Sequence, residues 1–203
     1  MKKITIVVED NVSVEEIGKA LKNSDLCEDC NNTVRVIDAE LGGVVRYGGL
    51  DWVVYNKGTA GAVRLISKDI VAYASFDKDG KNNLWAISDL RAFLNGSFTE
   101  KYNIKKGELF EHTTFEIATD GTYDEEECDD YVSLLTADEY RSWRWRIPAV
   151  DAFWWTATAD SDTNNFVECV DTDGALSDEE CYAKNGVRPT IWLKIDTPVE
   201  IVE

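Results

Sequence analysis

The chain has 203 residues, a length that fits one ordinary domain or one domain with a small appendage. Its 11% aromatic content excludes a largely disordered protein, and its net charge of −18, from 39 acidic and 21 basic residues, excludes a general nucleic-acid binder. No apolar run approaches the roughly 20 residues that cross a bilayer, and the N-terminus lacks the apolar stretch of a secretory signal. We therefore expect a protein made in the cytoplasm, with no membrane partner and no direct nucleic-acid partner.

Residues 1–32 have the pattern of a small strand–helix unit that precedes the main domain. The apolar run at residues 3–8 predicts a strand, and the capping box that begins at Ser13 predicts a helix to about Lys22. The polar, acidic stretch at residues 24–32 is the best linker in the chain. The sequence therefore predicts an appended unit over residues 1–32 and a main domain over residues 33–203.

From residue 33 onward, short β-type runs are combined with two short helix signals. Turn residues separate runs that are rich in β-branched and aromatic side chains, which predict strands. These runs are residues 44–47, 50–55, 62–67, 166–170 and 190–195. Ser88 and Thr136 are predicted helix N-caps, and Gly96 is the predicted left-handed C-cap of the first helix. Strands with a few short helices, rather than alternating strands and helices, predict an α+β fold with antiparallel sheets.

The five cysteines do not predict a disulfide framework, because their number is odd and no secretory signal accompanies them. They are Cys27, Cys30, Cys128, Cys169 and Cys181. Cys27 and Cys30 have the CxxC spacing of a zinc or redox site. A zinc site would need a second such pair, however, and the two acids between these cysteines raise a thiol pKa. We expect free thiols, no bound metal and no cofactor.

The sequence carries few signals for catalysis. His112 is the only histidine, and the chain has neither a GxSxG motif nor a glycine-rich phosphate loop. We therefore interpret His112 as a structural residue. A hydrolase that uses two carboxylates is the weakest alternative, because such a pair would be hard to recognise among 39 acids.

Calcium is a second alternative that the residues leave open. No EF-hand loop fits the acidic turns, because the first ligand position falls on Cys169 in one case and on Ser75 in the other. The oxygen-rich run Asp160, Asp162, Asn164 and Asn165 would suit a calcium site of another type. A solvated acidic loop is the simpler interpretation of the same run.

Several segments, taken in order, resemble an uncharacterised domain of gut bacteria and their phages. The segments are residues 65–67 (LIS), 88–96 (SDLRAFLNG), 134–136 (LLT) with Glu139, 154–157 (WWTA) and 186–193 (GVRPTIWL). That domain is similar to the C-type-lectin-like fold, which formylglycine-generating enzymes and the variable proteins of retroelements also use. The resemblance covers residues 40–195 and leaves residues 1–32 outside, as a candidate anchor to an assembly such as a virion.

The resemblance implies a scaffold that displays variable loops rather than a shared reaction. The surroundings of Cys169 and Cys181 do not match the paired cysteines of formylglycine-generating enzymes. In physical terms the recurring residues are structural. Arg188 could pair with a buried carboxylate, and Pro189 could lead into an edge or terminal strand.

The strongest candidate for a binding surface is the acidic segment at residues 158–185. It holds eight acids and one base, and residues 108–181 as a whole hold 21 acids and three bases. Such a segment is expected to contribute little core and to display loops. The predicted binding residues are Asp160, Asp162, Asn164, Asn165, Asp171, Asp173 and Trp155. Trp154 and Trp155, as neighbours in a strand, are expected to divide between core and surface.

These observations lead to two hypotheses from different classes. The first is a non-enzymatic recognition module, phage- or prophage-encoded, that binds a protein or glycan partner at a cell surface. The second is an acidic inhibitor that mimics nucleic acid and blocks a basic partner, such as a defence nuclease. In both cases the negative field of the acidic segment favours a basic partner.

Overall fold

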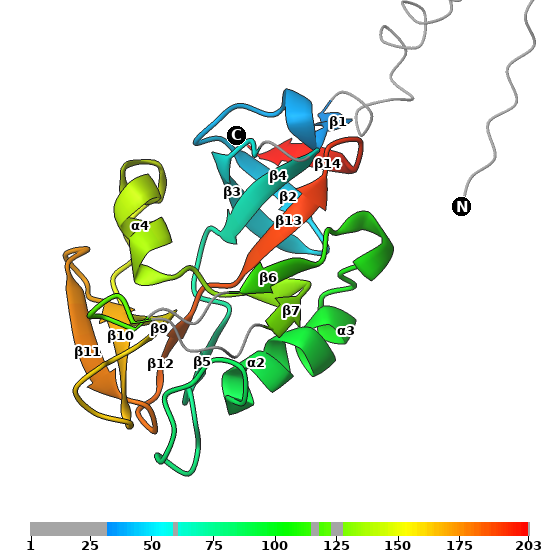
Figure 1. Ribbon diagram of the computed structural model, residues 1–203. Coiled ribbons are helices and arrows are strands. Elements are labelled where there is room, and N and C mark those ends of the chain that lie inside the picture. Colours follow the sequence, from blue (N-terminus) through cyan, green and yellow to red (C-terminus); the bar gives the residue numbers. More distant parts are fainter. Residues whose placement is uncertain (1–31, 59–60, 115–117, 123–127, 203) are drawn as a thin grey trace, which may run out of the picture. The chain divides into compact units, whose positions relative to one another are not determined.

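The computed structural model describes residues 32–58, 61–114, 118–122 and 128–202 (Figure 1). The chain divides into two units, residues 1–33 and 34–203, and nearly all of the first lies outside the described residues. The strand and helix predicted for that unit, and the pair Cys27 and Cys30, therefore lie outside them too. In the described part, no helix has the length and apolar character needed to cross a bilayer.

The larger of the sheets has seven strands and is formed by both ends of the second unit. In spatial order they are β1 (Thr33–Arg35), β14 (Pro198–Val202), β2 (Val44–Tyr47), β3 (Leu50–Asn56), β4 (Ala62–Ser67), β13 (Thr190–Lys194) and β8 (Val132–Ser133). From β14 to β8 the neighbours pair antiparallel. β13 lies inside the sheet, between β4 and β8, so the expectation that Pro189 leads into an edge or terminal strand is wrong.

The second sheet has five strands and carries most of the acidic segment. Its order is β11 (Leu176–Glu180), β10 (Phe166–Val170), β9 (Trp154–Ala159), β12 (Asn185–Val187) and β5 (Ala72–Ala74). β9 and β12 pair in parallel, and the other pairs are antiparallel. A third, two-stranded sheet consists of β6 (His112–Thr114) and β7 (Cys128–Asp130). Short helices beside antiparallel sheets confirm the predicted α+β class.

The predicted helix N-caps are confirmed, whereas the predicted C-cap is wrong. Ser88 accepts a hydrogen bond from Arg91 N and begins α2 (Asp89–Phe93), and Thr136 forms a complete capping box with Glu139 at the start of α4 (Ala137–Trp143). Gly96 has φ −111° and ψ −110°, so it kinks the chain instead of entering the left-handed region. Helical structure resumes beyond the kink. The remaining helical segments are η2 (Val36–Asp38), η3 (Leu94–Phe98), α3 (Thr99–Lys101), η4 (Lys106–Glu108) and η5 (Arg144–Arg146).

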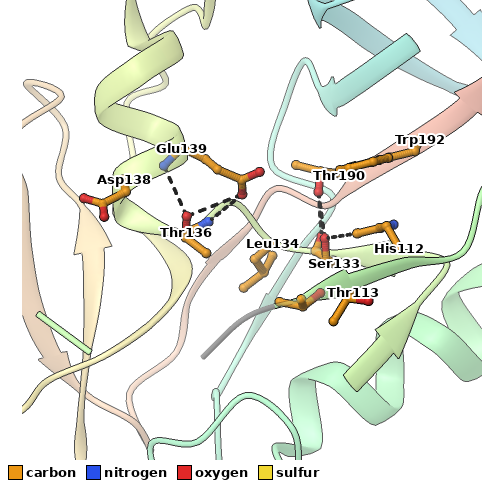
Figure 2. A pocket seen from close by; sticks show the side chains of 10 residues that line it. His112, Thr113, Ser133, Leu134, Thr136, Asp138, Glu139, Thr190 and Trp192 are labelled. Carbon is orange, nitrogen blue, oxygen red and sulfur yellow. Dashed lines mark hydrogen bonds between the residues drawn. The ribbon is translucent and has the colours of Figure 1, made fainter. Parts of the chain in front are cut away.

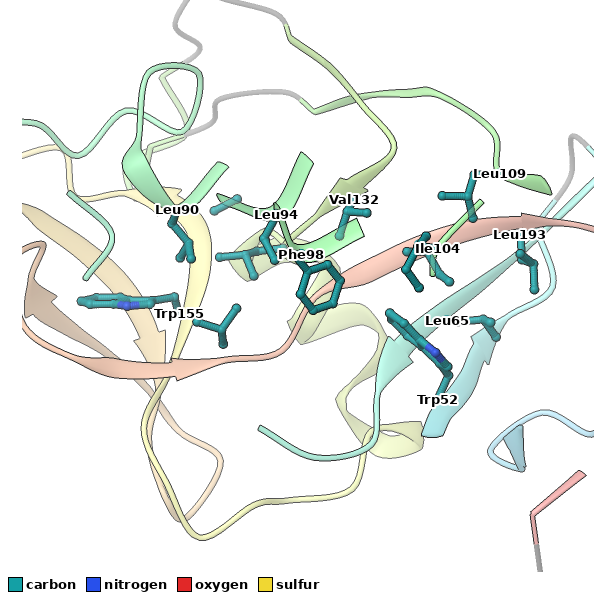
Figure 3. Packing of buried hydrophobic residues seen from close by; sticks show 14 of the residues in the cluster. Trp52, Leu65, Leu90, Leu94, Phe98, Ile104, Leu109, Val132, Trp155 and Leu193 are labelled. Carbon is teal, nitrogen blue, oxygen red and sulfur yellow. The ribbon is translucent and has the colours of Figure 1, made fainter. Parts of the chain in front are cut away.

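Two groups of buried side chains form the core, and Figure 3 shows part of the larger one. The larger group contains Trp155, which contacts Phe76 edge-on at 6.0 Å between ring centroids. Trp154 belongs to the smaller group and packs edge-on against Tyr140 of α4. Both tryptophans are buried, so the expected division between core and surface is wrong. The physical reason is that β9 lies inside its sheet and has a hydrophobic cluster against each face.

The acidic segment also contributes more to the core than expected. Val167, Cys169, Val170 and Cys181 are fully buried, and residues 176–180 form strand β11 in register with β10. The acidic composition of β11 disfavours a strand by propensity alone. Hydrogen bonding along the whole of β10 overrides that preference, so the expectation of a segment with little core is wrong.

Two buried charged side chains hold distant parts of the chain together. Arg188 has no buried carboxylate partner within the described residues, contrary to expectation. It donates instead to the backbone oxygens of Ser67, Lys68 and Pro148 at 3.0 to 3.2 Å. Burial lowers the pKa of Arg188 to about 10, against the opposing effect of the Asp69 carboxylate. The carbonyl groups of these three residues thereby obtain hydrogen-bond donors.

The second of these side chains is Asp130, a fully buried carboxylate whose partner is Arg91. The two are 2.7 Å apart, and Asp130 also accepts from Asn95, Trp85 and Thr114. Four donors from four other elements or loops thus converge on one carboxylate. Such a saturated arrangement is typical of a structural charge.

Candidate functional site: a pocket between three strands and the start of helix α4

A pocket of about 220 Å³ lies where β6, β8 and β13 meet the first turn of α4 (Figure 2). Its lining residues come from four separate parts of the sequence. They are His112, Thr113, Thr114, Ser133, Leu134, Thr136, Asp138, Glu139, Thr190 and Trp192. The pocket is smaller than the usual range for drug-sized ligands, about 300–1,000 Å³, so it suits a small polar group or one side chain.

A chain of short hydrogen bonds crosses the floor of the pocket. Ser133 Oγ lies 2.9 Å from His112 Nε2 and 3.0 Å from Thr190 Oγ1 (Figure 2). All three residues are buried. The antiparallel register places Thr190 directly opposite Ser133, which explains why the two hydroxyl groups meet.

The imidazole of His112 is held in a stack of planar groups. It lies parallel to the Trp192 ring at 4.7 Å between centroids, and the Arg64 guanidinium lies 3.8 Å from the centre of that ring. Burial lowers the pKa of His112 to about 4, which outweighs the raising effect of the Asp130 carboxylate. His112 is therefore neutral near pH 7 and is a weak base.

Glu139 brings a carboxylate into the pocket from the first turn of α4. Its Oε2 accepts from Thr136 N at 3.1 Å, and its Oε1 lies 3.3 Å from Arg64 Nη1. Burial raises the pKa of Glu139 despite the opposing effects of Thr136 and Arg64. The negative charge of this carboxylate is therefore only partly compensated.

The predicted acidic binding residues divide between two places. Asp160, Asp162, Asn164 and Asn165 occupy the loop between β9 and β10, whereas Asp171 and Asp173 occupy the turn between β10 and β11. These two connections lie at opposite ends of β10, about 16 Å apart for a five-residue strand. They therefore flank one hairpin and do not converge on a single small ligand.

Three of these carboxylates also shape their own turns. Asp160 Oδ1 accepts from the backbone nitrogens of residues 162 and 163, and Asp171 Oδ1 from those of residues 173 and 175. Asp173 Oδ1 accepts from Ala175 N at 2.8 Å. Each acid uses one oxygen in this way, which is the usual role of Asp in tight turns.

Trp155, the remaining predicted binding residue, lies in the core and has no exposed surface. Its indole Nε1 donates to Ala74 O at 2.8 Å, inside the five-stranded sheet. The prediction that Trp155 contacts a partner is therefore wrong. Among the described residues, no group of three or more His, Cys, Asp or Glu side chains is placed to hold a metal ion.

Sequence reasoning singled out His112 and Glu139 separately but missed the pocket. His112 was interpreted as structural, and Glu139 as part of a capping box. Ser133 carries no signal in the sequence, and Thr190 and Trp192 stand out only as members of the 186–193 segment, which indicates no pocket. The pocket depends on the pairing of β13 with β8, which joins residues about sixty positions apart and leaves no local pattern.

Comparison with known proteins gives one match. A family model described as a domain of unknown function (DUF6273) matches residues 141–195, a segment that includes Thr190 and Trp192 of the pocket. Comparison with curated proteins gave no match. Comparison with solved structures gave none either.

Proposed function

We propose that this chain is a non-enzymatic recognition module with a C-type-lectin-like fold, which binds a basic protein or glycan partner through the β9–β10–β11 hairpins. The α+β architecture and the acidic connections on both ends of β10 support this proposal. The resemblance to a domain of gut bacteria and phages supports a partner at a cell surface. The same resemblance supports a position on the virion, if the protein is made in the cytoplasm of a phage-infected cell.

One observation carries the proposal: the acids of these hairpins are not matched by basic side chains. Among the described residues, seven of their carboxylates take part in no salt bridge. The seven are Asp160, Asp162, Asp171, Asp173, Asp178, Glu179 and Glu180. Glu168, the one buried acid of the same hairpins, is paired with Arg141 at 3.1 Å. The pairing of the buried acid and the absence of pairing at the surface leave a net negative field outside.

A field of this kind acts on association before contact. It raises the rate at which a basic partner is captured, and the rate falls as salt screens the charges. β11 is in addition an edge strand, and its charged side chains protect that edge from pairing with other chains. The hairpins are therefore suited to attract a partner by charge and unsuited to bind one by adding a strand.

The test neutralises the acids of the two connections and compares capture from intact bacterial cells and from their lysate. The variant carries Asp160→Asn, Asp162→Asn, Asp171→Asn and Asp173→Asn. A control with the same change in net charge carries Glu40→Gln, Asp79→Asn, Glu100→Gln and Glu200→Gln, all exposed and outside the hairpins. Asn oxygens still accept the turn hydrogen bonds, so the thermal midpoint of the first variant should stay nearly unchanged.

We expect the first variant to capture the partner on intact cells at least about tenfold more slowly at low salt, and the control to be nearly normal. Equal capture by wild type and the first variant at low salt would contradict the proposal. Recovery of a basic nuclease from lysate, with nothing recovered from intact cells, would favour the acidic inhibitor instead.

A further inference from the structure

The hydroxyl groups that line the pocket have no hydrogen atoms left to offer a ligand. Thr113 Oγ1 donates to Asp129 at 3.0 Å, and Thr114 Oγ1 donates to Asp130 at 3.0 Å. Thr136 Oγ1 donates toward Glu139 Oε2 at 3.5 Å. Three of the five hydroxyl hydrogens are thus directed to carboxylates.

The other two hydroxyl hydrogens remain within the chain of hydrogen bonds on the floor. If His112 Nε2 carries no hydrogen, Ser133 donates to it and Thr190 donates to Ser133. If Nε2 carries the hydrogen, it donates to Ser133, which donates to Thr190, and Thr190 turns to Ser133 O at 3.4 Å. In either tautomer the hydroxyl hydrogens are used and oxygen lone pairs remain. A ligand must therefore donate to these oxygens.

The charge of the lining points in the same direction. Asp138 and Glu139 contribute two carboxylates, and no Lys or Arg is among the described residues that line the pocket. Arg141 is engaged with Asp138 and Glu168, and Arg64 is stacked on Trp192 as well as paired with Glu139. The raised pKa of Glu139 shows that these neighbours do not fully offset its burial. A ligand that carries a positive charge would complement the carboxylates of this lining.

We propose that this pocket binds a primary ammonium group, held by the Glu139 carboxylate and the hydroxyl oxygens of Ser133, Thr136 and Thr190. An ammonium group fits because it has three donors, no acceptor and one positive charge. The inference rests on the proposed recognition function in one respect, the basic character of the partner. It further identifies the chemical group that the partner presents and the pocket that binds this group.

An ammonium group reaches the pocket from one of two sources. A lysine side chain of a protein partner carries it on a flexible stem, and an amino sugar of a glycan carries it on a ring. The small volume of the pocket admits the lysine stem along Leu134, an apolar wall next to the polar floor. Separate probes distinguish the two sources.

The experiment follows the binding of small probes to the full chain by nuclear magnetic resonance. The first pair of probes is Nα-acetyl-lysine methylamide and its neutral analogue Nα-acetyl-norleucine methylamide. The second pair is glucosamine and N-acetylglucosamine. The reporters are the Trp192 indole N–H and the backbone amides of Thr136 and Thr190, all from the lining.

We expect saturable shifts of these reporters with the lysine probe, and at least about tenfold weaker binding of the neutral analogue, since a charge-assisted hydrogen bond is lost. Shifts with glucosamine and none with the lysine probe would keep the ammonium group and assign it to a glycan. Equal binding of charged and neutral probes, or no saturable shift with either amine, would overturn the proposal.

Two variants with the same charge change locate the effect. Glu139→Gln keeps an acceptor for Thr136 N and removes the charge, so binding of the amine should weaken at least about tenfold. Asp79→Asn removes a charge from an exposed residue outside both the pocket and the hairpins, and should bind as wild type does. Equal weakening by both variants would mean that the overall negative charge of the protein attracts the amine. That result would contradict binding in the pocket. Because Glu139 is not one of the four residues neutralised on the hairpins, failure here and failure of the proposed function are separate results.

Discussion

A fully buried acidic residue, Asp130, and a partly buried one, Glu139, differ in how completely hydrogen bonds satisfy their carboxylates. Asp130 is fully buried and receives hydrogen bonds from Arg91, Asn95, Trp85 and Thr114. Glu139 faces a pocket, receives hydrogen bonds from Thr136 and Arg64, and has a raised pKa. A saturated carboxylate holds a fold together, whereas one with remaining capacity can receive a ligand.

The largest effect should come from breaking the saturated arrangement. Asp130→Ala leaves Arg91 and three neutral donors without their acceptor, and we expect it to lower the free energy of unfolding by about 3–5 kcal/mol. Urea denaturation followed by tryptophan fluorescence measures this loss. Asp129→Ala is the matched control, because Asp129 is exposed and, within the described residues, its side chain accepts a hydrogen bond only from Thr113. A loss below about 1 kcal/mol for Asp130→Ala would remove the contrast with Glu139.

An intermediate effect should follow from acidification, through the histidine of the pocket. The pKa of His112 is about 4 in the folded state and about 6.5 in the unfolded state, so the unfolded chain binds a proton first. The free energy of unfolding should therefore fall as the pH drops from about 6.5 to about 4, by up to about 3 kcal/mol. It should change little for this reason above pH 7.

Denaturation curves of wild type and His112→Gln across this pH range separate the histidine from the carboxylates. His112 is the only histidine of the chain, so the difference between the two proteins reports this group alone. We expect the variant to lose less stability on acidification than the wild type. Parallel pH profiles would mean that His112 is protonated as easily in the folded state as in the unfolded one.

The smallest effect should come from the unsaturated carboxylate. Glu139→Gln preserves the capping acceptor and relieves the burial of a charge, while the pairing with Arg64 is lost. We expect a change in the free energy of unfolding of no more than about 1 kcal/mol, measured in the same urea experiment. A loss as large as that of Asp130→Ala would class Glu139 with the structural charges.

The sequence predicts what is local in this fold and misses what is not. Ser88 and Thr136 were recognisable as N-caps, because capping depends on residues within three or four positions. The prediction that one tryptophan is exposed was wrong, because burial depends on neighbours that are distant in the sequence. The left-handed cap predicted at Gly96 was wrong too, since helical structure resumes beyond that residue. β11 was missed for the same reason, since its pairing with β10 outweighs its acidic composition.

The candidate site illustrates the same limit. His112, Ser133, Glu139 and Thr190 carry no shared motif, and only the pairing of β13 with β8 and the position of α4 bring them together. The charge of the acidic segment, in contrast, is obtained by counting its residues and can be predicted without knowledge of the fold. Composition therefore predicted a negative surface but not the pocket beside it.

The strand order of the seven-stranded sheet has a consequence for the synthesis of the protein. β13 separates β4 from β8, and β14 separates β1 from β2, so residues 190–202 complete the sheet at two places. A nascent chain that still has these residues in the ribosome exposes open edges of β2 and β4 and lacks the Arg188 contacts. Folding of this unit is therefore expected to finish only once residues 190–202 have left the ribosome, and chains that terminate before these residues should aggregate through those open edges.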